Sequence, residues 1–112
     1  MVRRYVPEAG DIVWLHFDPQ AGHEQAGHRP AVVVSPSTYN GKTGLMLCCP
    51  ITTQVKGYPF EVSIAGTRPG VVLSDQIKNL DWVARKASHK GKISPNELAQ
   101  IREKASILIG KQ

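Results

Sequence analysis

The sequence predicts a small, mainly β domain: an antiparallel barrel or half-barrel followed by one C-terminal helix. The first two thirds of the chain contain short apolar or alternating segments separated by turn residues. Helical periodicity is found only in the last segment. Strands followed by a single helix, without β–α–β alternation, favour an antiparallel sheet, and one domain is expected to cover residues 1–112.

Six segments are expected to form strands: residues 11–17, 31–34, 45–51, 60–64, 71–73 and 82–87. The first is rich in β-branched and aromatic side chains between turn-forming residues. The second is an apolar run between two prolines, which is typical of a strand buried on both faces. In the third, Pro50 indicates an edge strand or a bulge. The fourth alternates apolar and polar side chains, as a half-exposed strand does.

The most regular pattern lies near the end of the chain. Ser94 is a candidate N-cap, Pro95 takes the first helical position and Glu97 completes a capping box. Gly110 is placed to end the helix. One apolar face is expected at helical spacing, formed by Leu98, Ile101, Ala105 and Leu108.

Composition bounds the class of protein. The 112 residues are 41% hydrophobic, as in a folded globular domain, and no apolar stretch is long enough to span a bilayer. The formal charge of +5 favours an anionic partner such as nucleic acid, although an inert basic surface would give the same charge. Cys48 and Cys49 are adjacent and unsuited to a mutual disulfide, so we expect packing roles and a reducing, cytoplasmic location.

The densest polar segment is residues 23–30, expected to be a loop between two strands. It contains Glu24, His28 and Arg29. Loops on rigid scaffolds often carry function, although a polar loop with Gly and Pro is also a common solvated connection. His16 stands alone on the first strand and is expected to be a surface histidine.

A second polar segment follows the strand at residues 45–51. Thr52, Thr53 and Gln54 offer hydroxyl and amide groups for base edges, Lys56 a cation for phosphate, and Tyr58 a ring for stacking on an unpaired base. A hairpin loop in which Thr and Gln bond their own backbone is the alternative.

Together these residues could support RNA cleavage by the substrate's own 2′-OH. Glu24 or His28 could serve as the base, and His28 equally as the acid. Arg29 suits phosphoryl oxygens, and Thr52 could hold the phosphate by its hydroxyl. No acidic cluster of the kind that holds Mg²⁺ is evident in the sequence, so we expect neither a metal nor another cofactor.

Four stretches resemble the MazF/PemK family of toxins from bacterial toxin–antitoxin pairs, in order and over nearly the whole chain: GDIVWLHFDP, EQAGHRPAVVVSP, CCPITTQVKGYPFEV and VLSDQIKNLDW. The resemblance implies an SH3-like barrel, a homodimer, and sequence-specific endoribonuclease activity on single-stranded messenger RNA without a metal. The products would carry a 2′,3′-cyclic phosphate and a 5′-hydroxyl. The implied partner is an acidic, MazE-like antitoxin.

The resemblance also assigns roles to residues. It implies that Arg29 and Thr52 are the catalytic pair and that Glu24 and His28 support them. It implies RNA contacts for Phe17, Thr53, Gln54, Lys56, Asp75 and Gln76. His16 departs from the family, whose closest members tend to have Asp there.

Two other classes of protein remain possible on the same barrel. One is a CcdB-like toxin that binds DNA gyrase without catalysis, and the other is a basic RNA-binding module. The segments around Arg29 and Thr52 favour the nuclease, because a gyrase binder has no need of them.

Overall fold

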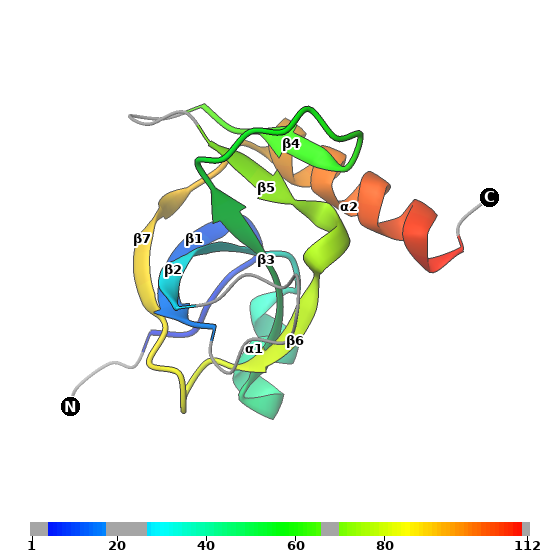
Figure 1. Ribbon diagram of the computed structural model, residues 1–112. Coiled ribbons are helices and arrows are strands. Elements are labelled where there is room, and N and C mark those ends of the chain that lie inside the picture. Colours follow the sequence, from blue (N-terminus) through cyan, green and yellow to red (C-terminus); the bar gives the residue numbers. More distant parts are fainter. Residues whose placement is uncertain (1–4, 18–26, 66–69, 111–112) are drawn as a thin grey trace.

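The described part of the chain folds into seven strands and three helical segments, whose arrangement is shown in Figure 1. The computed structural model describes residues 5–17, 27–65 and 70–110. The strands are β1 (Asp11–His16), β2 (His28–Val33), β3 (Leu45–Thr52), β4 (Glu61–Ser63), β5 (Val71–Leu73), β6 (Lys78–Asp81) and β7 (Ser88–Lys92). The helices are α1 (Ser37–Thr43), the short 3₁₀ helix η1 (Ser74–Gln76) and α2 (Pro95–Ile109).

The sheet is antiparallel and is organised around β3. Its strand order is β4-β5-β3-β2-β1-β7, and β6 also pairs with β3. Figure 1 shows the strands curling around a common interior, with α2 beside β4 and β5. The prediction of a mainly antiparallel β fold with a C-terminal helix is therefore confirmed.

Apolar side chains pack on both faces of the central strands. One cluster includes Val13, Ala31 and Cys48, and the other includes Val32 and Cys49. The two neighbouring cysteines thus point to opposite faces, as strand geometry requires. Both are buried free thiols, which confirms their predicted packing role.

The capping signals predicted α2 well. Ser94 Oγ accepts a hydrogen bond from the Glu97 N–H at 3.1 Å, and the Glu97 carboxylate accepts one from the Ser94 N–H at 2.8 Å. Gly110 ends the helix with a φ of 116°. Ile101 is buried, but Leu108 is 53% exposed, so the predicted apolar face is wrong at its last residue.

One element was not predicted, and one predicted strand was wrong. Residues 37–43, for which no element was expected, form α1, and the buried Asn40 side chain holds it by donating hydrogen bonds to the carbonyls of Pro7 and Ser35 at 2.8 and 3.0 Å. Residues 82–86 form turns, and the strands lie on either side of them as β6 and β7.

The position of Pro50 in the sheet and the first residue of β2 also differ from expectation. Pro50 lies in the central strand rather than at an edge, opposite Ala31 of β2. On its other side β3 pairs with β6 through residues 45–48 and with β5 through residues 51–52, so Pro50 lies where β3 changes partner. His28 and Arg29 belong to β2 rather than to a loop.

A buried carboxylate joins the start of β1 to β7. Asp11 accepts hydrogen bonds from the Tyr5 hydroxyl at 2.5 Å, the Glu8 N–H at 3.0 Å and Lys92 Nζ at 2.7 Å. Burial alone would raise the pKa of Asp11, but these three donors outweigh it and hold the pKa below the usual 3.8. Among the described residues, no helix is long and apolar enough to cross a membrane.

We expect Asp11→Asn to lower the free energy of unfolding by about 1.5–3 kcal/mol at pH 7, because hydrogen bonds to a charged acceptor are lost. Because the pKa of Asp11 is lower in the folded protein than in the unfolded chain, its ionised carboxylate stabilises the fold above the unfolded-state pKa. This stabilisation is lost as the pH falls through the folded-state pKa. The difference between wild type and variant should therefore shrink below about pH 4. Urea denaturation of the wild type and the variant at pH 7 and pH 3 measures this difference in the free energy of unfolding. Asp81→Asn, at an exposed carboxylate, is the control, and an equal loss there would contradict the account.

Candidate nucleic-acid cleavage site

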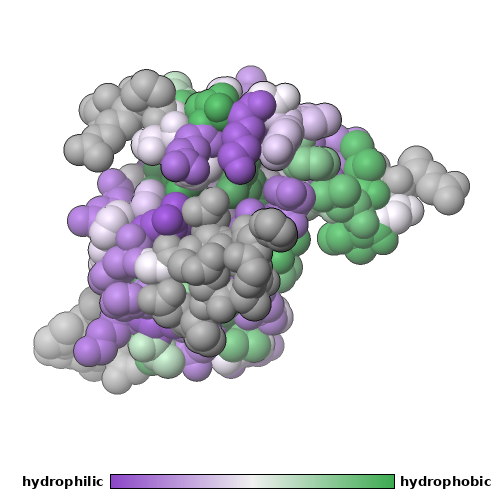
Figure 2. Space-filling view, in the orientation of Figure 1, coloured by the Kyte–Doolittle hydropathy of each residue, from purple (hydrophilic) through white to green (hydrophobic). Residues whose placement is uncertain are grey.

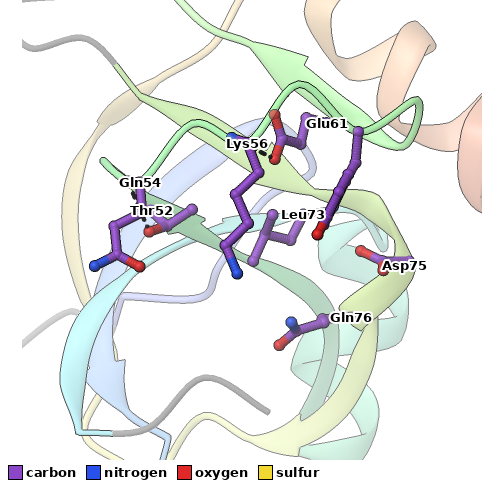
Figure 3. Close-up of a pocket in the computed structure, with 8 residues that line it drawn as sticks. Thr52, Gln54, Lys56, Glu61, Leu73, Asp75 and Gln76 are labelled. Carbon is purple, nitrogen blue, oxygen red and sulfur yellow. Dashed lines mark hydrogen bonds between the residues drawn. The ribbon is translucent and has the colours of Figure 1, made fainter. Parts of the chain in front are cut away.

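One open cavity of about 300 Å³ collects most of the polar residues predicted from the second segment. Its lining is Thr52, Gln54, Lys56, Tyr58, Glu61, Leu73, Asp75 and Gln76. These residues come from the end of β3, the connection to β4, β4 itself, β5 and η1. In Figure 3 the Lys56 side chain extends into the middle of this space, with Thr52 on one side and Gln76 on the other.

The wall formed by residues 53–60 is held in place by side-chain hydrogen bonds to its backbone. Glu61 accepts hydrogen bonds from the N–H groups of Lys56 and Gly57 at 3.1 and 3.0 Å. Gly57 has a φ of 78°, a conformation that favours glycine. Thr52 Oγ1 accepts a hydrogen bond from the Gln54 N–H at 3.1 Å, as shown in Figure 3. The segment therefore has a defined shape.

A positively charged side chain and an aromatic ring lie near each other on this wall. Lys56 Nζ lies 5.9 Å from the centre of the Tyr58 ring, within the range of a cation–π contact. The Tyr58 ring is 53% exposed and makes an edge contact with Phe60. Asp75 faces the same cavity and is exposed, so it offers a hydrogen-bond acceptor to donor groups on a ligand.

The ladder between β2 and β3 brings Arg29 towards the end of β3. Ala31 pairs with Pro50 in this antiparallel ladder. Continuing the register by two residues places Arg29 opposite Thr52, and alternation puts both side chains on the face that carries Ala31 and Pro50. On this continued register, a guanidinium and a hydroxyl would share one face at one end of the sheet.

Two more cations lie near this face. Lys78 is opposite Cys48 in the β3–β6 ladder. Burial raises the pKa of the Cys48 thiol to about 12, while the charges of Arg85 and Lys78 act in the opposite direction. Both cations are therefore within electrostatic reach of the Cys48 thiol on the inner face.

His28 occupies the other face of β2. Its ring stacks on those of Trp14 and His16, at centroid distances of 4.9 and 3.9 Å. The residue is exposed, but partial loss of water around its ring, followed by the charge of His16, lowers the pKa of His28 below 6.5. His28 is therefore mainly neutral at pH 7 and able to accept a proton, although alternation separates it from Arg29.

The structure brings together some of the predicted site residues and not others. Thr53 is exposed at the end of β3 and does not line the cavity. Phe17 is 2% exposed and packs in the core beside β1, and its contact with RNA stays a prediction. Glu24 lies outside the described residues. His16 is exposed, as expected of a surface histidine, but it is not isolated, because its ring stacks on that of His28.

Sequence reasoning missed Glu61 and Leu73 as cavity residues. The alternation of residues 60–64 predicted that Glu61 lies on the polar face of a strand. It did not indicate that the carboxylate accepts hydrogen bonds from two N–H groups of the preceding segment, because that contact depends on how the chain turns before β4.

We expect Glu61→Ala to loosen the cavity wall without unfolding the protein. The N–H groups of Lys56 and Gly57 would lose their acceptor, so their amide hydrogen exchange should accelerate at least tenfold, while exchange in α2 stays unchanged. Glu61→Gln, which keeps one carbonyl acceptor, should lie in between. Unchanged exchange at both amides would show that the carboxylate does not hold this wall.

Comparison with known proteins agrees with the fold and identifies the family. Residues 8–109 match the family described as PemK-like, MazF-like toxin of type II toxin–antitoxin system. The chain is 59% identical to the endoribonuclease toxin MazF of Escherichia coli strain K12 over 111 residues, covering 98% of this chain and 100% of that protein. Similar solved structures include MazF from Deinococcus radiodurans (Form-I), at 51% identity, a TM-score of 0.92, and 96% and 100% coverage of the two chains. The MazE–MazF structure (Form-III) from the same organism matches at 48% identity, a TM-score of 0.86 and the same coverage. The chain belongs to the family of PemK-like, MazF-like toxins of type II toxin–antitoxin systems.

Proposed function

We propose that this protein is a toxin endoribonuclease that cleaves single-stranded messenger RNA at specific sequences and so inhibits translation and growth. The observation that carries the proposal is the β2–β3 register: continued beyond Ala31 and Pro50, it would bring Arg29 opposite Thr52, which lines a cavity with base-binding chemistry. The E. coli relative is named an endoribonuclease toxin, which supports the same activity here and favours it over the gyrase-binding alternative.

In the proposed reaction the RNA provides its own nucleophile. The 2′-OH loses its proton and attacks the adjacent phosphorus, and the bond to the 5′-oxygen breaks. That oxygen takes a proton to give a 5′-hydroxyl, and the other fragment ends in a 2′,3′-cyclic phosphate. Because the attacking oxygen belongs to the substrate, the reaction does not depend on a metal-bound hydroxide.

Arg29 and Thr52 are the residues proposed to hold the reacting phosphate. A guanidinium can donate two hydrogen bonds to phosphoryl oxygens and stabilise the charge that develops on them. The Thr52 hydroxyl can donate to a phosphoryl oxygen while it accepts from the Gln54 N–H. Glu24 and His28 are the two candidates for proton transfer, and the lowered pKa of His28 favours the neutral ring, which has a lone pair free to accept a proton.

The remaining cavity residues are proposed to bind the bases around the cleavage point. Lys56 would pair with a phosphate, and the exposed Tyr58 ring would stack on a base. Asp75 accepts hydrogen bonds, whereas the amides of Gln54 and Gln76 both donate and accept, so together they can read a base edge. Thr53, next to the cavity, could contact a base or a 2′-OH.

Protein partners form part of the proposal. An acidic, MazE-like antitoxin would complement a chain of net charge +5, and the Deinococcus MazE–MazF structure supports such a partner. We also propose a homodimer, supported by exposed aliphatic side chains at the end of α2, visible in Figure 2 beside the C-terminus: Ile107, Leu108 and Ile109. The site of action would be the cytoplasm, where messenger RNA is translated.

The direct test is to incubate the purified protein with a long RNA in excess EDTA and to determine the end groups of the fragments. We expect cleavage at defined sites, with cyclic phosphate on one side and 5′-hydroxyl on the other. Replacing the ribose at a mapped site by 2′-deoxyribose or 2′-O-methylribose should stop cleavage there, because the attacking oxygen is then missing or blocked. Binding of the modified RNA should persist, because phosphate contacts and stacking do not need that hydroxyl.

Arg29→Lys keeps the positive charge but removes the fork of two donors, so this variant should also lose cleavage. Efficient cleavage at the 2′-deoxy site would mean that water is the nucleophile and would overturn the proposed chemistry. A protein that binds RNA without cutting it would instead be an RNA-binding module.

A further inference from the structure

Three aromatic rings form a stack on the outer face of β1 and β2. The rings of Trp14 and His28 lie 4.9 Å apart with 27° between their planes, and those of His16 and His28 lie 3.9 Å apart with 28° between them. Trp14 and His16 are two residues apart on β1, so their side chains leave the same face about 7 Å apart. These spacings fit a His28 ring inserted between the other two, and we refer to Trp14, His28 and His16 as the ring stack.

The ring stack is positioned by the sheet but is not part of the core. His16 pairs directly with His28 in the β1–β2 ladder, and Trp14 pairs with Pro30. His16 and His28 are exposed, and Trp14 is half-buried. The His16 ring therefore stands at one end of the stack with its remaining surface towards solvent.

The β2–β3 ladder relates the ring stack to the proposed RNA-binding cavity. The ladder ends at Ala31 and Pro50; if its register continued, His28 at the start of β2 and Thr53, just after the end of β3, would lie at the same end of the sheet. Thr53 directly joins Thr52 and Gln54, which line the cavity. A strand of RNA leaving the cavity across the end of β3 would therefore meet the ring stack next.

A cation is bonded to the main chain of His16, the residue at one end of the ring stack. Arg85 Nη1 donates a hydrogen bond to the His16 carbonyl oxygen at 2.8 Å, which fixes the guanidinium next to this residue. A base stacked on an aromatic ring beside a cation that attracts its phosphate is a common arrangement in single-strand recognition. The observations favour a nucleotide over an apolar peptide as the occupant of this end.

We propose that the His16 ring binds an unpaired base of the RNA, adjacent to the nucleotides held in the cavity. His16 would thereby extend the length of RNA that the protein recognises, without taking part in bond cleavage. The inference rests on the proposed ribonuclease function.

The test uses an RNA of a sequence that the wild-type protein is first shown to cleave, then synthesised with 2′-O-methylribose throughout, so that binding is measured without cleavage. Fluorescence anisotropy of an end-labelled strand gives the dissociation constant. We expect His16→Ala to weaken binding about five- to a hundredfold, the range for loss of one stacked base. In the wild-type protein, an abasic substitution at one position of the RNA should raise the dissociation constant by a similar factor. In His16→Ala, the same abasic substitution should raise the dissociation constant little further.

Two further variants separate stacking from a structural effect. His16→Phe keeps a flat ring and should bind nearly as the wild type does. His89→Ala removes another exposed histidine, which lies on β7 outside the ring stack, and should leave binding unchanged. Unchanged binding by His16→Ala, failure of His16→Phe to restore it, or equal sensitivity of both proteins to every abasic position would overturn the inference. Absence of cleavage of the unmodified RNA by the wild type would instead refute the proposed function.

Discussion

The burial of both faces of β3 is the constraint on which the rest of the structure depends. Cys48 and Cys49 are neighbours, yet they pack in different apolar clusters on opposite faces of the sheet. A slip of one residue in the pairing of this strand would exchange the two faces along its whole length. The register with β2 is therefore held by both clusters, and the polar residues at the end of the strand inherit their faces from it.

The proposed site begins where these clusters end. Thr52 is the last residue of β3 and stays buried, while the chain after it turns outwards and offers polar side chains to the cavity. Glu61 fixes the cavity wall by accepting hydrogen bonds from its backbone, so the polar groups are positioned before a ligand arrives. Preorganised donors and acceptors are what binding of a charged transition state requires, because they need no rearrangement during the reaction.

Features that depend on local chemistry could be predicted from the sequence, and features that depend on distant contacts could not. Ser94, Glu97 and Gly110 predict both ends of α2, because capping is decided within a few residues. α1 was missed because its residues are weak helix formers, and the helix depends on Asn40 bonding to Pro7 and Ser35. Likewise, the polar residues of the site could be selected by type, but the separation of His28 from Arg29 on opposite faces of β2 required a strand where a loop was expected.

The central claim, that the β2–β3 register makes Arg29 and Thr52 act as a unit on one phosphate, is tested most directly by a double-mutant cycle on RNA cleavage. The rate constants of wild type, Arg29→Ala, Thr52→Val and the double variant are compared under single-turnover conditions. The account predicts that the two effects are strongly non-additive. Arg29→Ala alone should lower the rate constant about 100- to 1000-fold, and adding Thr52→Val should lower the rate constant little further. If the two losses instead multiply in full, the residues act independently, and the shared site inferred from the register is contradicted.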